Sequence, residues 1–105
     1  MNVYEIKTDP LEQAEIAQLA RLHRLATLIN HRCPDQEIEI SAWKDAILVD
    51  IFTVQHPFGP KDRIRRFGYF DGVNECPNGG LDEAQRWLEG FAEVSLKEEK
   101  HADSH

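Results

Sequence analysis

The spacing of hydrophobic residues changes twice along this chain, and that change constrains the fold more than any other feature. Apolar residues recur every three or four positions over residues 11–31 and again over 80–96, which predicts two amphipathic helices. Residues 37–71 instead have the pattern of extended strands separated by turns. We therefore expect an α+β fold in the order helix, three-stranded antiparallel meander, helix.

The first helix has a clear start and a wide apolar stripe. Asp9 can cap it, Pro10 suits the first helical position, and Glu12 follows three residues after the cap. Pro34 disfavours helical geometry at the preceding residue, so we expect the helix to end near residues 30–31. The stripe can pack on the sheet alone, or also form a homodimer through residues 11–31. It consists of Ile16, Leu19, Leu22, Leu25, Ala26, Leu28 and Ile29.

Three segments have the composition of strands. Residues 37–43 alternate, with Glu37 and Glu39 on the polar side, and residues 46–54 are apolar on both sides apart from Asp50, as in a central strand. Strict alternation over 63–70 places Ile64 and Phe70 on one side of the third strand. It places four side chains together on the opposite side: Arg63, Arg65, Phe67 and Tyr69.

The remaining segments complete one domain over residues 1–96. Residues 71–80 form a turn-rich loop, and the second helix begins after Gly79-Gly80, with Trp43 and Trp87 expected in the core. Residues 97–105 lack an apolar pattern, which predicts a disordered polar tail. A short N-terminal edge strand over residues 2–7 is a further option.

Composition and charge narrow the functional classes. The 105 residues suit one domain, contain no apolar run of membrane-spanning length and begin without a signal-peptide pattern. Two cysteines are too few for a disulfide scaffold, so we expect a cytoplasmic protein with reduced thiols. The net charge of -7 opposes binding to nucleic acid at long range, although residues 51–70 carry four basic residues and one acid.

The segment Arg65-Arg66-Phe67-Gly68-Tyr69-Phe70 resembles the aromatic strand motif of RNA-recognition domains, with Arg66 where that family has glycine. The resemblance implies stacking of single-stranded nucleic acid on an open sheet face, by Phe67 and Tyr69 beside Arg63 and Arg65.

The order of the expected elements is similar to that of double-stranded-RNA-binding domains. In that family a basic cluster at the start of the last helix grips phosphates. Residues 80–85 here carry Asp82 and Glu83 instead, so the resemblance extends to topology and not to the RNA-binding chemistry.

A metal site or a small enzyme centred on Cys33, His56 and Cys76 is another alternative. These residues are suitable ligands or nucleophiles, but their spacing matches no zinc-binding or catalytic motif. We therefore expect no enzymatic activity, no cofactor and no bound metal.

The interpretation that remains is a non-enzymatic regulator or inhibitor that binds another protein. We expect an acidic surface to dock in a basic groove of the partner, with the tip of the loop 55–62 as an aromatic anchor. In size, charge and lack of motif the chain resembles small proteins of phages and mobile elements, which include anti-CRISPR inhibitors. The expected contact residues are Glu37, Glu39, Phe58, Asp82 and Glu83.

Overall fold

The computed structural model has two long helices and one antiparallel sheet, and it describes residues 10–55, 59–72 and 74–103. Sheet order follows chain order, β1-β2-β3-β4, and each strand runs antiparallel to its neighbours. The elements are α1 (Pro10–Arg32), β1 (Gln36–Ala42), β2 (Ile47–Val54), β3 (Lys61–Phe70), β4 (Asn74–Glu75) and α2 (Leu81–Asp103). The α+β class predicted from the sequence is confirmed, with the short β4 as an additional strand in the segment expected to be a loop.

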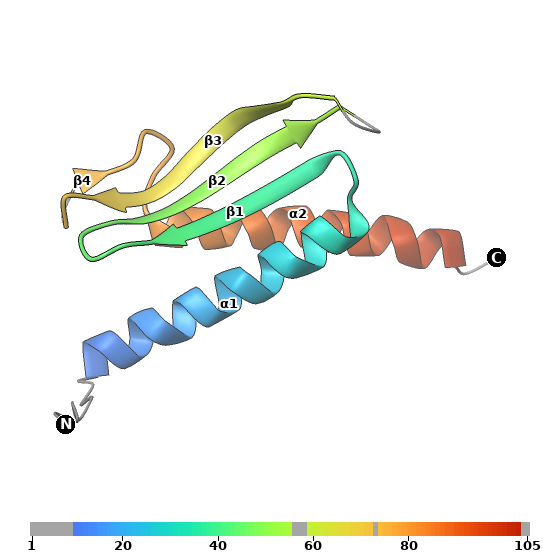
Figure 1. Ribbon diagram of the computed structural model, residues 1–105. Helices are drawn as coiled ribbons and strands as arrows, with labels where there is room; N and C mark the ends of the chain where they lie inside the picture. Colours follow the sequence, from blue (N-terminus) through green and yellow to red (C-terminus); the bar gives the residue numbers. More distant parts are fainter. Residues whose placement is uncertain (1–9, 56–58, 73, 104–105) are drawn as a thin grey trace, which may run out of the picture.

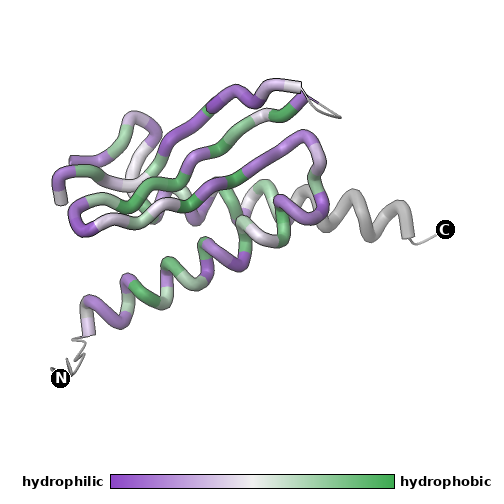
Figure 2. The backbone as a smooth tube through the Cα atoms, viewed as in Figure 1, coloured by the Kyte–Doolittle hydropathy of each residue, from purple (hydrophilic) through white to green (hydrophobic). Residues whose placement is uncertain are grey.

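Both helices cover the same face of the sheet (Figure 1). We call the uncovered side the open face. The core lies between the sheet and the helices, and its least exposed large side chains are Leu22, Ile29, Val49, Ile51 and Leu88. Burying each such side chain contributes about 1.5–3 kcal/mol, so the core between the sheet and the helices is a main source of stability. Along the tube of Figure 2, the first half of β3 is strongly hydrophilic, whereas β2 is mostly hydrophobic.

A β-bulge in β3 decides which side chains reach the open face. The register between β2 and β3 shifts between Ile51 and Phe52, because Ile51 lies opposite Arg65 and Phe52 opposite Arg63. Ile64 is therefore the extra residue, and the alternation reverses on either side of it. The prediction that Arg63 shares a side with Arg65, Phe67 and Tyr69 is wrong, since strict alternation does not allow for an inserted residue.

The first helix begins at Pro10, as the capping signal predicts, and runs to Arg32. Near its end the Asn30 amide closes part of the free edge of β1. Its Nδ2 donates to the Ile38 carbonyl oxygen at 2.9 Å, and its Oδ1 accepts from the Ile38 N–H at 2.7 Å. This residue thus satisfies both main-chain groups of an edge position.

The second helix begins at Leu81, and the Glu83 carboxylate accepts a hydrogen bond from the Gly80 N–H at 3.0 Å. This is the backward half of a capping box. The helix continues to Asp103, so the disordered tail expected from residue 97 is not found up to that residue. Lys and Glu are good helix formers even without an apolar face. Residues 2–7 lie outside the described residues.

Two further features complete the fold. Trp43 is 61% exposed in the β1–β2 turn, contrary to the expected core position, whereas Trp87 stacks on Phe91 with ring centroids 5.3 Å apart. Neither of the two described helices combines the length and the apolar character needed to cross a membrane.

Candidate functional site

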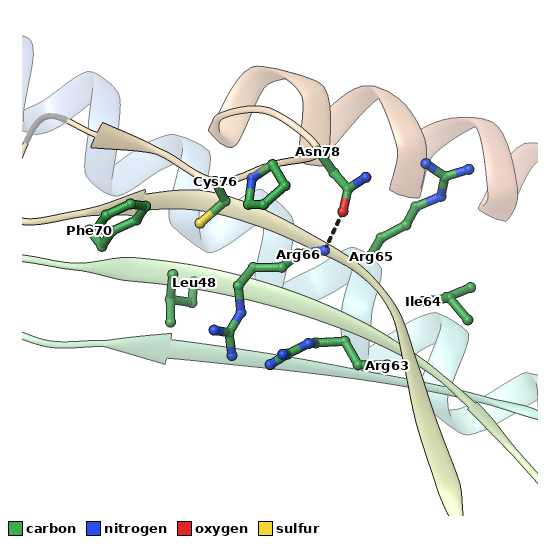
Figure 3. A pocket seen from close by; sticks show the side chains of 9 residues that line it. Leu48, Arg63, Ile64, Arg65, Arg66, Phe70, Cys76 and Asn78 are labelled. Carbon is green, nitrogen blue, oxygen red and sulfur yellow. Dashed lines mark hydrogen bonds between the residues drawn. The ribbon is translucent and has the colours of Figure 1, made fainter.

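A cleft of about 370 Å³ lies where β3 meets the segment before α2 (Figure 3). Three arginines of β3 line it together with two of the most exposed large apolar side chains, Ile64 and Phe70. The full lining is Leu48, Arg63, Ile64, Arg65, Arg66, Phe70, Cys76, Pro77 and Asn78.

The wall opposite β3 is built by residues 76–79. The Cys76 N–H donates to the Gly68 carbonyl at 3.0 Å, and the Gly68 N–H donates to the Gly79 carbonyl at 2.9 Å. Asn78 then pairs with Arg66 in both directions: its N–H donates to the Arg66 carbonyl at 3.3 Å, and its Oδ1 accepts from the Arg66 N–H at 2.8 Å. This pairing follows the outer edge of β3 only as far as Arg66.

Gly68 is required for the close approach of β2 to β3 beside this cleft. Its φ is +112°, and a Cβ at this position would lie 1.9 Å from the Ile47 carbonyl oxygen. Only glycine fits there, because both the backbone conformation and the neighbouring strand exclude a side chain.

The charge in the cleft is only partly balanced. Asp50, 6% exposed, accepts hydrogen bonds from Arg66 Nε at 2.6 Å and Nη2 at 3.2 Å, and Arg63 Nη1 lies 3.8 Å from its Oδ1. The bond to Asp50 raises the pKa of Arg66, so this group stays charged. No partner is seen for Arg65 among the described residues. Three guanidinium groups and one carboxylate therefore leave the cleft positive.

The three arginines leave β3 in different directions. In Figure 3, Arg63 and Arg66 extend across the open face toward β2, whereas Arg65 extends to the other side of the β3 ribbon. The cleft thus presents positive charge on both sides of the strand. Arginine offers several N–H donors in a planar fork, which suits it to bind carboxylates.

The acidic residues expected to bind a partner lie on two different sides of the molecule. Glu37 and Glu39 are on the open face, where Lys61 Nζ contacts their carboxylates at 2.9 and 2.6 Å. Those contacts, first with Glu39 and then with Glu37, raise the pKa of Lys61, whose Nζ also lies 4.7 Å from the Phe52 ring centroid. The ion pairs offset the negative charge that Glu37 and Glu39 would present to a partner.

Asp82 and Glu83 lie in the first turn of α2, on the covered side of the sheet. The Asp82 carboxylate accepts a hydrogen bond from Gln18 Nε2 at 2.7 Å, and Glu83 caps the helix. Phe58, the expected aromatic anchor, lies outside the described residues. The structure therefore does not bring the expected acidic contacts together.

The expected nucleic-acid platform is also divided. Phe67 is 3% exposed in the core beneath the helices. Tyr69 is half-buried, and its hydroxyl donates to Glu15 Oε1 at 2.6 Å, a bond that with burial raises the pKa of Tyr69 to about 12. Neither ring lies on the open face beside Arg63. The stacking arrangement implied by the RNA-recognition motif is therefore absent from the described part of β3.

The cysteines do not meet either. Cys33 follows α1 at the connection to β1, whereas Cys76 follows β4 at the other end of the sheet (Figure 1). Burial raises the pKa of the Cys76 thiol, which disfavours the nucleophilic thiolate. His56 lies outside the described residues, and no group of three or more metal-binding side chains occurs within them.

The outward side of α1 carries a second, shallower hollow of about 570 Å³ between residues 23 and 32. Most leucines of the α1 stripe lie in the core instead, although Ile16 is 54% exposed and Leu28 half-buried. Pairing of two copies through residues 11–31 remains a prediction.

Sequence reasoning missed Arg66, Ile64, Phe70 and Asn78 as lining residues. The cluster of basic residues over 61–66 was the available signal, because it stands out in an acidic chain. The cleft itself depends on the bulge and on the return of residues 76–79 along β3, and periodicity reveals neither.

Comparison with protein-family models, curated proteins and solved structures finds no match to this chain.

Proposed function

We propose that this protein is a non-enzymatic regulator that binds another protein through the cleft on β3. The observation that supports this best is the lining, in which exposed Ile64 and Phe70 accompany three arginines. Arginine and aromatic side chains are enriched among the residues that dominate binding energy at protein interfaces. The proposal retains the regulator predicted from the sequence and assigns its contact surface to the cleft in place of the acidic residues.

The chemistry of the cleft favours an acidic segment in the partner. Asp50 balances part of the positive charge, while Arg65 has no partner among the described residues. A partner carboxylate can accept two hydrogen bonds from such a guanidinium group. Docking through acidic residues of this protein has weaker support, since Glu37 and Glu39 already contact Lys61.

Nucleic acid is the competing occupant of a basic cleft. The net charge of -7 opposes it, and Phe67 and Tyr69 are under the helices rather than available for stacking. We therefore favour an acidic protein segment and leave nucleic acid as an outcome of the test.

Two charge reversals of equal size distinguish a contact in the cleft from a general effect of net charge on binding. Arg65→Glu changes the cleft, whereas Arg86→Glu changes an exposed residue of α2 outside it. Tagged wild-type protein would capture partners from nuclease-treated lysate, and each variant would then be titrated with the purified partner by calorimetry. We expect Arg65→Glu to weaken binding by about tenfold or more and Arg86→Glu to change it by less than about twofold.

Equal affinities of the two variants would remove the cleft from the contact surface. Retention of material only in lysate without nuclease treatment would favour nucleic acid. Both variants must first give unfolding curves close to that of the wild type, so that a loss of binding is not a loss of folding.

A further inference from the structure

The outer edge of β3 is occupied along only part of its length. Residues 76–79 and β4 pair with it from Arg66 to Phe70. Between Lys61 and Arg65, no segment within the described ranges pairs with it on the side away from β2. An unpaired strand edge offers N–H and C=O groups at the spacing that another extended chain requires.

We infer that the acidic segment of the partner binds as an added β-strand along this free edge, between Lys61 and Arg65. The inference rests on the proposed function and specifies the form of its partner. Strand addition of this kind gains affinity from main-chain hydrogen bonds and specificity from the alternating side chains. A polypeptide offers N–H donors and C=O acceptors in alternation along such an edge, whereas a nucleic-acid backbone offers phosphate acceptors without N–H donors at that spacing.

The charges along the edge disfavour a second copy of this chain when two edges pair symmetrically or in register. Antiparallel self-pairing centred on Arg63 would place Arg63 opposite Arg63 and Lys61 opposite Arg65. Parallel pairing in register would place each of these cations beside its own equivalent. Like charges on directly opposed residues destabilise a strand pair, and opposite charges stabilise it. Lys61 already contacts Glu37 and Glu39, so Arg63 and Arg65 are the two cations that repel a second copy in these pairings and attract an acidic segment.

The bulge indicates which other side chains the partner segment carries between its acidic residues. Ile64, the inserted residue, is 47% exposed at the edge, between Arg63 on the open face and Arg65 on the other side. A segment that mixes acidic with β-branched apolar residues can pair its carboxylates with the arginines and cover Ile64. The loop wall at Asn78 marks the point where the added strand must end.

Three synthetic peptides test the inference on the full chain. The first alternates Glu and Val over about seven residues, the length of a typical strand, with both ends blocked. The second has the same side chains but is methylated on every backbone nitrogen, and the third has Lys in place of Glu. Titrations followed through the backbone amide NMR signals report both affinity and location.

We expect the Glu–Val peptide to shift the amide signals of residues 61–65 and to bind about tenfold or more tightly than its methylated counterpart, which cannot donate main-chain hydrogen bonds. Equal affinity of these two peptides would overturn strand addition and leave the proposed function in place. No binding of the Glu–Val peptide, or preference for the Lys–Val peptide, would overturn both.

Discussion

A single glycine allows β2 and β3 to pair closely beside the cleft. At Gly68 the left-handed backbone and the nearby Ile47 carbonyl both exclude a Cβ, whereas a Cβ added at Gly72, where φ is +76°, would meet no atom within 4 Å. We expect Gly68→Ala to lower the free energy of unfolding by about 3–4 kcal/mol and Gly72→Ala by about 1–2 kcal/mol. Urea unfolding measures both. Equal losses would show that the strands relax around Gly68.

One hydrogen bond connects β3 to α1 and makes the contact between these elements sensitive to alkaline pH. Glu15 accepts from the Tyr69 hydroxyl, and this bond, with burial, raises the pKa of Tyr69 from its ordinary value of 10.0 to about 12. The folded protein therefore holds this proton more tightly than the unfolded chain. The resulting stabilisation is complete below pH 10 and is lost as the pH rises toward 12.

Absorbance titration of the phenolate tests this expectation, with Tyr69→Phe identifying the signal of Tyr69 against that of the other tyrosine, Tyr4. Glu15→Gln should lower the pKa of Tyr69 and reduce the loss of stability at alkaline pH. A Tyr69 that ionises at the same pH in the wild type and in Glu15→Gln would contradict the role assigned to the bond.

The elements were predictable to the extent that each depends on local pattern. Helical spacing and the caps around Pro10 and Gly80 located the starts of both helices, and the apolar run of β2 identified the central strand. The faces of β3 were not predictable, because a one-residue bulge reverses alternation without a distinctive sequence. The cleft depends on that bulge and on pairing between Arg66 and Asn78, which are separated along the chain by the turn into β4.

On the scale of the whole molecule, local and total charge have opposite signs. The protein carries a net charge of -7, yet the free half of the β3 edge carries three cations and one acid, Asp62. Because exposed charges are screened beyond about 8 Å at physiological salt, a docked segment responds mainly to the nearby arginines. An acidic chain can thus bind an acidic segment at this one place while its overall charge repels most polyanions.

Hydrogen–deuterium exchange on the complex with the captured partner tests the location of this surface most directly. We predict slower exchange in residues 61–66 and 76–79 of the complex than in the free protein, with little change along α1. Protection confined to α1 or α2, with unchanged exchange along β3, would contradict it.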